Sequence, residues 1–438
     1  MFFEQFLHTV QVTPDRVALR YFSESLTYSE LAKRIAHRAQ DFRDSPTPYW
    51  IISTENPILG LVDWLALMYA GKIGILAPKE WRDDYFDFFS DHHDVKNCVA
   101  WQPSGVSTRP FPPATVQPHD LFLGILSSGS SGKPKLIWKD YQAWFSAFPH
   151  QSKVFDLQSS DALLLIDALA YSANANAALH MLWLGGTVVF TSVRALPQAQ
   201  DPTVTAVFLV PSHARLWCSY QKSAWPAIRS FFTAGEKLDQ TLAKRIKEIL
   251  PQATLTEYYG AAELGHIAYH QNEDIEGHPQ LVGKPFPGVQ IQLQGGQIYV
   301  QSPYISPEYR AIRTVGDRGM WAGDALVLLG REGRLFNRRG LNIWAEEIEH
   351  TAWLMPGLRD VLAIESKSGK IHVLYVAEQT WTPQQWRQLF LAKLPKSKCP
   401  SFFKQVPEIP RGAGGKVTVE VAARMYVDTE EDSAVTLE

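Results

Sequence analysis

A run of small and basic residues, SSGSSGKPK at 127–135, is the segment of this sequence best suited to hold phosphate groups. Glycine and serine leave backbone N–H groups free to donate to phosphate oxygens, and Lys133 and Lys135 add positive charge. The spacing is not that of a Walker A loop, because Pro134 follows Lys133 where a Ser or Thr is required. Taken alone, the segment fits a flexible Gly/Ser surface loop equally well.

A second segment, TEYYGAAELGH at 256–266, combines two aromatic side chains with a single carboxylate. A tyrosine ring can stack on a base, and Glu263 beside a phosphate loop could hold Mg²⁺. In isolation the segment is explained better as an amphipathic turn with a solvated glutamate.

Two segments nearer the C-terminus carry further charged residues. The stretch 321–349 holds a lone acid, Asp324, and a lone base, Arg331. A carboxylate such as Asp324 can accept the two hydroxyls of a ribose, as acidic residues do in other nucleotide sites. The stretch 409–417 places Lys416 after a glycine-rich turn. Alone, that turn cannot be distinguished from an exposed hairpin tip.

The overall composition is that of an ordinary globular chain. With 438 residues, it is long enough for two or three domains of roughly 150 residues each. Apolar residues make up 45% and charged residues 20%, so the chain can bury a sizeable core. The net charge of -3 argues against a nucleic-acid binder, which usually has a basic excess.

Nothing in the sequence predicts secretion or membrane insertion. The three cysteines, Cys98, Cys218 and Cys399, lie far apart, which indicates neither a disulfide framework nor a metal knuckle. The N-terminus has no basic leader before an apolar run, so no signal peptide is expected. The longest apolar stretch, 177–193, is interrupted by a histidine and two glycines and is shorter than the ~20 residues of a spanning helix. We expect a cytoplasmic protein without a transmembrane segment.

The apolar pattern alternates between helix and strand for about three quarters of the chain. Apolar residues recur at helical spacing in 26–40 and 57–71, and strand-like runs follow at 48–54 and 72–78. The same order recurs in 162–193 and again in 206–235. Repeated strand–helix–strand units with apolar strands predict a parallel sheet that helices cover on both faces.

The pattern changes after Gly296, where short alternating segments are typical of hairpins. The last hundred residues then predict a small α+β core. We therefore expect an α/β fold. A large N-terminal domain, residues 1–331, would contain parallel sheets flanked by helices and a β-rich subdomain. A small, mobile α+β C-terminal domain would comprise residues 332–438.

Together and in this order, the four segments resemble those of the adenylate-forming superfamily, which includes acyl-CoA synthetases, adenylation domains and luciferase relatives. Its members carry a Ser/Thr/Gly loop ending in Pro-Lys, a Tyr-Gly-x-Thr-Glu segment, a Gly-Asp pair, a Gly-Arg pair before a hinge, and a late Gly-Lys pair. Residues 233–238, TAGEKL, resemble the family's adenine segment, and residues 14–36 resemble its opening pattern. The resemblance covers nearly the whole chain.

The resemblance implies a role for each matching residue. Lys416 and Glu263 would be catalytic, with Glu263 also the Mg²⁺ ligand. Nucleotide-binding residues would be Ser127, Ser128, Gly129, Ser130, Ser131, Gly132, Lys135, Gly235, Glu236, Tyr258, Tyr259, Gly260, Asp324 and Arg331. The acyl pocket would include Tyr171, Ser172, Asn176 and Ala261. Arg339 and Gly340 would border the thiol channel, although a solvated turn explains this basic segment as well. Gly333 would be the hinge.

Several positions depart from the family pattern. Ala262 replaces the usual threonine, which removes a hydroxyl contact of about 0.5–1.5 kcal/mol. Gly333 and Arg334 replace an acidic hinge pair, and Asn337 replaces a common lysine. Glycine at position 333 still permits the backbone rotation that a hinge needs. The stretch between Asp324 and Arg331 is also shorter than in the family.

The resemblance implies a two-step reaction. A carboxylate attacks the α-phosphate of Mg-ATP, which yields an acyl-adenylate and pyrophosphate, and a thiol then displaces AMP. Lys416 would act in the first step only, before the C-terminal domain rotates. We expect an acyl-CoA product; loading of a phosphopantetheine carrier protein is the alternative, and a non-catalytic nucleotide-binding relative is a third.

The identity of the acid is the most open part of the prediction. Amino-acid-activating members place an aspartate where this chain has Ser172, so an α-amino acid is not expected, although Asp167 lies nearby. The small residues Ala173, Ala175 and Ala177 suggest space for an aryl or medium to fatty acyl group, but close helix packing explains them nearly as well.

Overall fold

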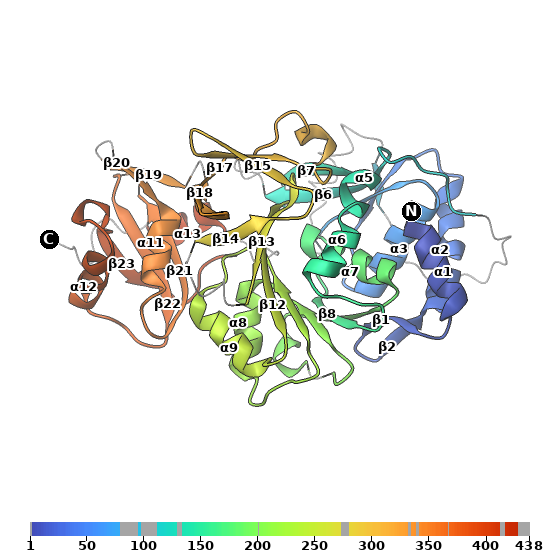
Figure 1. Cartoon of the computed structure of the whole chain (residues 1–438), viewed down its shortest axis with the longest axis horizontal. Helices are drawn as coiled ribbons and strands as arrows, with labels where there is room; N and C mark the ends of the chain where they lie inside the picture. The colour runs from blue at the N-terminus through green and yellow to red at the C-terminus, as the bar shows by residue number, and fades with distance from the viewer. Residues whose placement is uncertain are drawn as a thin grey trace. The chain divides into compact units, whose positions relative to one another are not determined.

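The computed structural model describes residues 2–78, 95–97, 112–128, 134–199, 201–272, 280–331, 334–338, 341–366, 368–411 and 417–427. The chain forms two compact units (Figure 1). The first unit consists of residues 1–276, 283–291 and 300–313, and the second of residues 277–282, 292–299 and 314–438. The predicted boundary at 331/332 falls within the second unit.

The first unit contains a large sheet of mainly parallel strands. Its strand order is β13 (Gly265–Gln271), β12 (Thr254–Ala261), β11 (Ser230–Thr233), β10 (Ala206–Phe208), β8 (Ala162–Ile166), β9 (Thr187–Thr191), β1 (Val17–Tyr21) and β2 (Glu24–Thr27). The six central strands, β12 to β1, run parallel to one another. The outer pairs β12–β13 and β1–β2 are antiparallel, and β14 (Leu281–Pro285) pairs with β13.

A second sheet of the same unit carries the predicted phosphate loop. Its order is β5 (Val95–Asn97), β3 (Tyr49–Ile52), β4 (Ile73–Leu76), β6 (Leu121–Ser128) and β7 (Pro134–Asp140). The first four strands are parallel, and β7 returns antiparallel to β6. The predicted parallel strands at 48–54 and 72–78 are therefore confirmed as β3 and β4.

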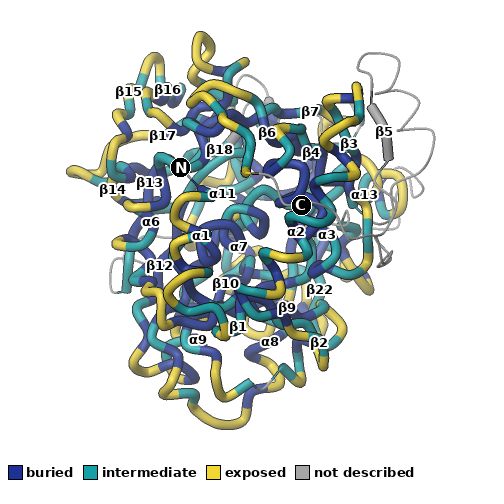
Figure 2. The backbone as a smooth tube through the Cα atoms, turned by 90° about the vertical axis from the view of Figure 1, so that its right-hand side faces the viewer, coloured by how far each residue is buried: buried dark blue, intermediate teal, exposed yellow. Residues whose placement is uncertain are grey.

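Helices lie between these strands along the chain. They are α1 (Phe2–Val12), α2 (Tyr28–Arg43), α3 (Pro57–Tyr69), α5 (Tyr141–Phe145), α6 (Phe148–Val154), α7 (Ser172–Leu184), α8 (Pro211–Tyr220) and α9 (Gln240–Ile249). In Figure 1, α8 and α9 lie side by side next to β12. Almost every residue of α3 is buried, and most of α7 is too, so both are core helices (Figure 2).

Local sequence explains where these helices begin and end. The Thr27 hydroxyl accepts from the Glu30 N–H while the Glu30 carboxylate accepts from the Thr27 N–H, a reciprocal cap that starts α2. The Asn56 side chain caps α3 by accepting from the Ile58 and Leu59 N–H groups, with proline at the first helical position. Gly185 ends α7 at φ +91°, a left-handed conformation that glycine adopts without strain.

The second unit has the predicted α+β organisation. Its elements are β17 (Asp317–Ala322), β18 (Ala325–Arg331), β19 (Leu335–Arg338), β20 (Leu341–Trp344), α11 (Ala345–Ala352), β21 (Leu358–Glu365), β22 (Ile371–Ala377), α12 (Pro383–Lys393), β23 (Phe402–Gln405) and α13 (Val419–Tyr426). Residues of β15 (Gln290–Gln294) and β16 (Gln297–Gln301) divide between the two units. A core of α11, α12 and the β21–β22–β23 sheet surrounds Trp386 and Phe390.

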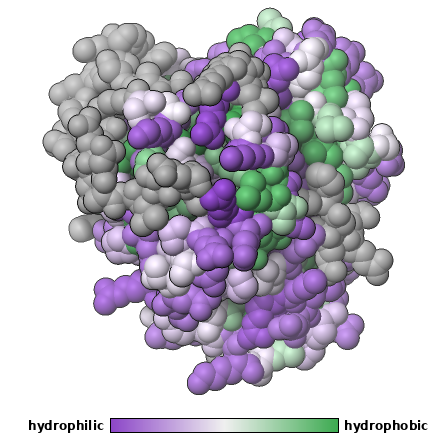
Figure 3. Space-filling view, turned by 90° about the vertical axis from the view of Figure 1, so that its left-hand side faces the viewer, coloured by the Kyte–Doolittle hydropathy of each residue, from purple (hydrophilic) through white to green (hydrophobic). Residues whose placement is uncertain are grey.

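The described surface of the second unit carries several exposed large apolar side chains, among them the neighbours Met320 and Trp321. They include Leu354, Leu391, Val421 and Met425. Figure 3 shows hydrophilic residues interspersed with small hydrophobic groups on the face that it draws. Among the helices that the structure describes, none is both long and apolar enough to cross a membrane.

Candidate active site

The ends of the predicted phosphate loop are held together as a hairpin. Ser127 pairs with Lys135 across β6 and β7, and Ser128 pairs with Pro134. Gly129, Ser130, Ser131 and Gly132 lie outside the described residues, as does Lys133. The antiparallel pairing fixes where the loop enters and leaves the sheet, and it brings Lys135 to the loop's edge.

Glu263 lies in the tight turn that joins β12 to β13. Ala261 pairs with Gly265 across the turn, and the Ser306 N–H donates to the Glu263 carbonyl at 2.9 Å. Gly265 has φ +73°, and a Cβ there would lie 2.7 Å from the Tyr304 Cβ, so the turn requires glycine. The turn therefore holds the half-buried Glu263 in a defined position.

A short segment, 306–309, joins this turn to the phosphate-loop hairpin. Its Ser306 N–H binds the Glu263 carbonyl, and its Tyr309 hydroxyl contacts the Lys135 Nζ. The Lys135 Nζ also lies 4.7 Å from the centroid of the Tyr309 ring. Residues more than a hundred positions apart, Lys135 and Glu263, are thus brought to one region of the first unit.

Glu263 suits a magnesium ion that arrives with a nucleotide. Mg²⁺ keeps several waters and is usually bound by one or two carboxylates together with substrate phosphates. Among the described residues, no group of three or more His, Cys, Asp or Glu side chains could hold a metal ion by itself. A single carboxylate beside a phosphate loop matches this mode of binding.

The two predicted tyrosines lie in different environments. Tyr258 is buried, with its ring centroid 4.8 Å from that of His266 and 5.2 Å from that of Phe155. Tyr259 follows on the opposite face of β12 and is partly exposed. Gly260 needs to be glycine, because a Cβ there would lie 2.6 Å from the Gly265 carbonyl oxygen. Tyr259 is the more accessible ring for stacking on a base.

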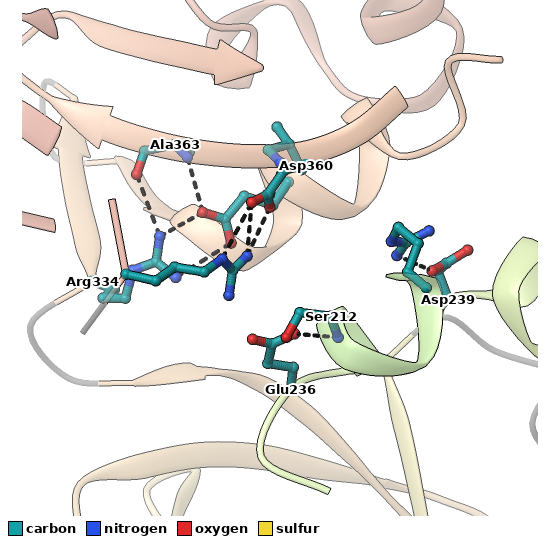
Figure 4. Close-up of polar contacts among 10 residues, drawn as sticks. Ser212, Glu236, Asp239, Arg334, Asp360 and Ala363 are labelled. Atoms are coloured by element: carbon teal, nitrogen blue, oxygen red, sulfur yellow. Dashed lines mark hydrogen bonds and ion pairs between the residues drawn. The ribbon is translucent and has the colours of Figure 1, made fainter. Parts of the chain in front are cut away.

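The predicted adenine segment is anchored through its polar side chains. The Glu236 carboxylate accepts from the Ser212 N–H at 3.2 Å, in the first turn of α8 (Figure 4). Gly235 has φ +88°, which glycine permits. At the end of the segment, the Leu238 N–H donates to the carboxylate of the buried Glu257 at 2.8 Å.

A buried charge cluster under this segment escapes sequence analysis. Glu257 accepts from the His270 Nε2 at 2.7 Å and also pairs with Lys237. Burial alone would raise the pKa of Glu257, but Lys237 and His270 hold it below its usual value. The position of Lys237 within the predicted adenine segment, two residues after Gly235, was the only sequence signal for this support.

Three of the four predicted acyl-pocket residues lie at the start of α7. Tyr171 precedes the helix, and Ser172 and Asn176 are partly exposed on it. Ala261, at the end of β12, is also partly exposed. The nearby carboxylate of Asp167 already accepts from the Tyr21 hydroxyl at 2.9 Å. Burial, and then Asp167, raise the pKa of Tyr21 to about 12, so the phenol keeps its proton.

The structure places two Gly-Asp pairs differently. Gly323 and Asp324, the predicted pair, are exposed at the tip of the β17–β18 hairpin. Asp317, which follows Gly316, is buried and lies directly opposite Arg331 in the strand register. Asp324 is separated from Arg331 by the length of β18, ~20 Å at ~3.3 Å per residue. Asp317 was not among the predicted site residues, although the short stretch from Asp324 to Arg331 was a reason to consider another Gly-Asp pair.

The residue after the predicted hinge is fixed to the second unit. Arg334 pairs with Glu349 at 2.5 Å and with Glu346 at 3.3 Å, and it donates to the Ala363 carbonyl at 3.3 Å (Figure 4). Burial raises the pKa of Glu346 to about 7, against the attraction of Arg334. Gly333, Arg339 and Gly340 lie outside the described residues.

The ends of the loop that contains Lys416 are also anchored. Arg411 and Val417 form an antiparallel bridge, and the residues between them, 412–416 with Lys416, lie outside the described residues. The Arg411 Nη2 donates to both oxygens of Asp360, at 2.8 and 2.9 Å (Figure 4). A charge-assisted pair of this kind ties the loop to β21.

If Lys416 acts in adenylate formation, as the resemblance implies, Asp360→Asn should slow that step by ~10-fold or more, because loosening the anchor would misplace the lysine. Single-turnover measurement of adenylate formation would check this, with little change expected in the melting temperature since the pair is partly exposed. Glu378→Gln, which removes the exposed Arg359–Glu378 pair of the same unit, is the matched control. Equal rates in the two variants would contradict the anchoring role.

Comparison with known proteins agrees with this geometry. Residues 75–309 match the family described as AMP-binding enzyme. The Staphylococcus aureus (strain COL) protein named "Putative long chain fatty acid-CoA ligase VraA" is 24% identical over 460 residues, which cover 98% of this chain and 99% of that protein.

Solved structures of two enzymes share the fold. The Bacillus subtilis O-succinylbenzoate coenzyme A synthetase MenE, in complex with AMP, has a TM-score of 0.81 and 17% identity, covering 95% of this chain and 97% of its own. ATP-bound MatB from Rhodopseudomonas palustris has a TM-score of 0.83 and 18% identity, and the match covers 98% of this chain and 100% of the MatB chain. The predicted α/β fold, with a large N-terminal and a small C-terminal domain, is confirmed.

Proposed function

Given that the chain belongs to the AMP-binding enzyme family, within the adenylate-forming superfamily, we propose that it is an ATP-dependent carboxylic acid–thiol ligase. The observation that supports this most is the segment 306–309, which brings the Lys135 edge of the phosphate loop and the Glu263 turn together. That arrangement supplies the positive charge and the metal-binding carboxylate that phosphoryl chemistry needs.

In the proposed first step, an oxygen of the acid attacks the α-phosphorus of ATP and pyrophosphate leaves. The loop 127–135 would hold the phosphates through its backbone N–H groups, and Tyr259 would contact the adenine. Glu263 would hold Mg²⁺, which supplies charge neutralisation when bound. A MenE structure in complex with ATP and magnesium ion supports these two cofactors by analogy.

In the proposed second step, the thiol sulfur attacks the acyl carbonyl and AMP leaves. Residues 332–438 would first rotate about Gly333, withdrawing Lys416 and presenting Arg339 and Gly340 to the thiol. The ion pairs of Arg334 with α11 support a hinge on its N-terminal side, because Arg334 would move with the second unit. The name of VraA supports CoA as the acceptor.

For the ribose, we propose Asp317 in place of Asp324. A buried carboxylate binds hydroxyls more strongly than one that water surrounds, and Asp317 lies opposite Arg331. Asp317→Asn should raise the KM for ATP by ~10-fold or more, since hydrogen bonds to charged groups are worth about 1.5–3 kcal/mol. Asp324→Asn should leave it unchanged. If both variants fold and the KM for ATP rises in Asp324→Asn but not in Asp317→Asn, the ribose contact belongs to Asp324.

ATP–pyrophosphate exchange with a panel of carboxylic acids tests the function directly. We propose an aryl or medium to fatty acid, and α-amino acids should support little exchange because Ser172 provides no carboxylate and Asp167 is bound by Tyr21. Thioester formation should then follow with CoA more readily than with a holo-carrier protein. Exchange with a standard amino acid and with no other acid would contradict the proposed acid class, and the absence of exchange would refute the function.

A further inference from the structure

A lysine is buried beside the candidate active site without a hydrogen-bonding partner. Lys139, on β7, is only 2% exposed. Among the described residues, none accepts a hydrogen bond from its Nζ or forms an ion pair with it, and the nearest aromatic contact is the Trp144 ring, with its centroid 5.7 Å away. A buried ammonium without a partner is strongly disfavoured, so its presence calls for a compensating anion.

Among the described residues, the acidic side chains around Lys139 form no direct ion pair with it. Glu263, Glu308 and Asp140 attract it through space and offset part of the effect of burial, which lowers its pKa to about 8. The Asp140 carboxylate already caps α5 at the Ala143 N–H and pairs with Arg310. Glu308 accepts from the Trp138 N–H at 3.2 Å. Lys139 therefore stays charged near neutral pH with capacity for three hydrogen bonds.

Two further buried polar side chains pair with each other, and the charge of Lys139 acts on one of them, His266. Gln151, on α6, is 1% exposed, and its Nε2 lies 3.3 Å from the Nε2 of His266 on β13. The Gln151 Oε1 is buried without a partner among the described residues. The pKa of His266 is lowered to about 3, mainly by burial and to a smaller extent by the charge of Lys139, so its ring is neutral.

The Gln151 amide can rotate by half a turn and accept from a His266 N–H instead. Its NH₂ group is then free to donate, while the charge of Lys139 acts on the neighbouring His266 ring. A carboxylate accepts through both oxygens, so it is the ligand that an ammonium and an amide NH₂ group would bind together. Lys139 lies on β7, which follows the phosphate loop, and Gln151 lies on α6. His266 lies on β13, which follows Glu263.

We propose that Lys139, Gln151 and His266 bind a second carboxylate at the far end of the acid substrate, so that the enzyme selects dicarboxylic acids. This inference rests on the proposed function and narrows its aryl or medium to fatty acids to those with a second acidic group. The first carboxylate reacts with ATP, and the second stays intact as a recognition group. Because the second carboxylate does not react, no bond forms or breaks beyond those of the two proposed steps.

The test compares matched acids in ATP–pyrophosphate exchange, namely adipic with hexanoic acid, suberic with octanoic acid, and terephthalic with p-toluic acid. The wild type should favour one diacid over its monoacid by ~10²-fold or more in kcat/KM. Lys139→Met should lose that preference, mainly through a higher KM, and should keep or improve the monoacid rate. Lys153→Met, on the exposed side of α6, is the matched control and should retain the preference.

Melting temperatures provide a readout that does not depend on turnover. Without ligand, Lys139→Met should melt no lower than the wild type, because a buried charge without a partner has been removed. The preferred diacid alone should stabilise the wild type and not the variant. If the methionine variant does not fold, Lys139→Gln takes its place, since it keeps a polar side chain but removes the charge.

Three outcomes would overturn the inference, and they separate it from the proposed function. Exchange with monoacids and no diacid preference would refute the second-carboxylate site while supporting the ligase. Equal loss of all acids in Lys139→Met would place Lys139 at the reacting carboxylate instead. No exchange by the wild type with any acid would overturn the function and this inference together.

Discussion

Lys416→Ala should abolish adenylate formation yet leave the conversion of a supplied acyl-adenylate to thioester intact. In the first step the lysine would offset the negative charge that develops between the attacking carboxylate and the α-phosphate. Such a contact is made mainly in the transition state, and its loss typically costs ~10²–10³ in rate. The second step would follow rotation of residues 332–438, after which Lys416 no longer faces the reacting atoms.

Parallel single-turnover assays of the two half-reactions check this prediction. Lys393→Ala removes an exposed lysine from the last turn of α12 in the same unit and should change neither rate. An equal loss in both half-reactions, or in neither, would show that Lys416 does not act specifically in adenylation. The Asp360→Asn variant should follow the same selective pattern with a smaller loss, because it disturbs only the anchor of the loop.

Glu263→Gln should lower the rate of ATP–pyrophosphate exchange by ~10²-fold or more at limiting Mg²⁺. The amide keeps the shape of the side chain but removes the negative charge that a hard cation prefers. Loss of one electrostatic contact in the transition state has an effect of this size. The backbone contact of Glu263 with Ser306 remains, so the turn and the melting temperature should be preserved.

A titration with magnesium separates metal binding from other roles of this residue. Raising Mg²⁺ should recover part of the activity of Glu263→Gln, since the substrate phosphates still bind the ion. Glu248→Gln, on the exposed face of α9, should behave as the wild type at every concentration. An exchange rate that is unchanged at limiting Mg²⁺ would remove Glu263 from the metal site.

Local patterns in the sequence predicted the fold well. The helix starts at Tyr28 and Pro57 depend on caps only one residue away, and the apolar strand runs at 162–166 and 187–191 need only be buried to join a sheet. The order of the motifs was likewise sufficient to recognise the family. These features depend on residues within a few positions of one another, which a sequence displays directly.

The contributions of individual site residues were less predictable. The pairs Gly316-Asp317 and Gly323-Asp324 cannot be told apart from the sequence. The register of β17 and β18 places Asp317 opposite Arg331 and leaves Asp324 at an exposed hairpin tip. The sequence predicts Glu236 as a nucleotide-binding residue, and the structure shows that its carboxylate also accepts a hydrogen bond from the first turn of α8. Both distinctions require the pairing of strands or loops that lie apart in the chain.

The sequence by itself determined the alternation of helices and strands and the family, and it predicted a phosphate loop at 127–135, a metal-binding Glu263 and a catalytic Lys416. Only the tertiary structure decided that the segment 306–309 joins Lys135 to the Glu263 turn, and that Lys139 is buried with Gln151 and His266 nearby. The reason is physical. Helix and strand periodicity reflects neighbouring residues, whereas the solvation of a charge depends on every segment packed around it.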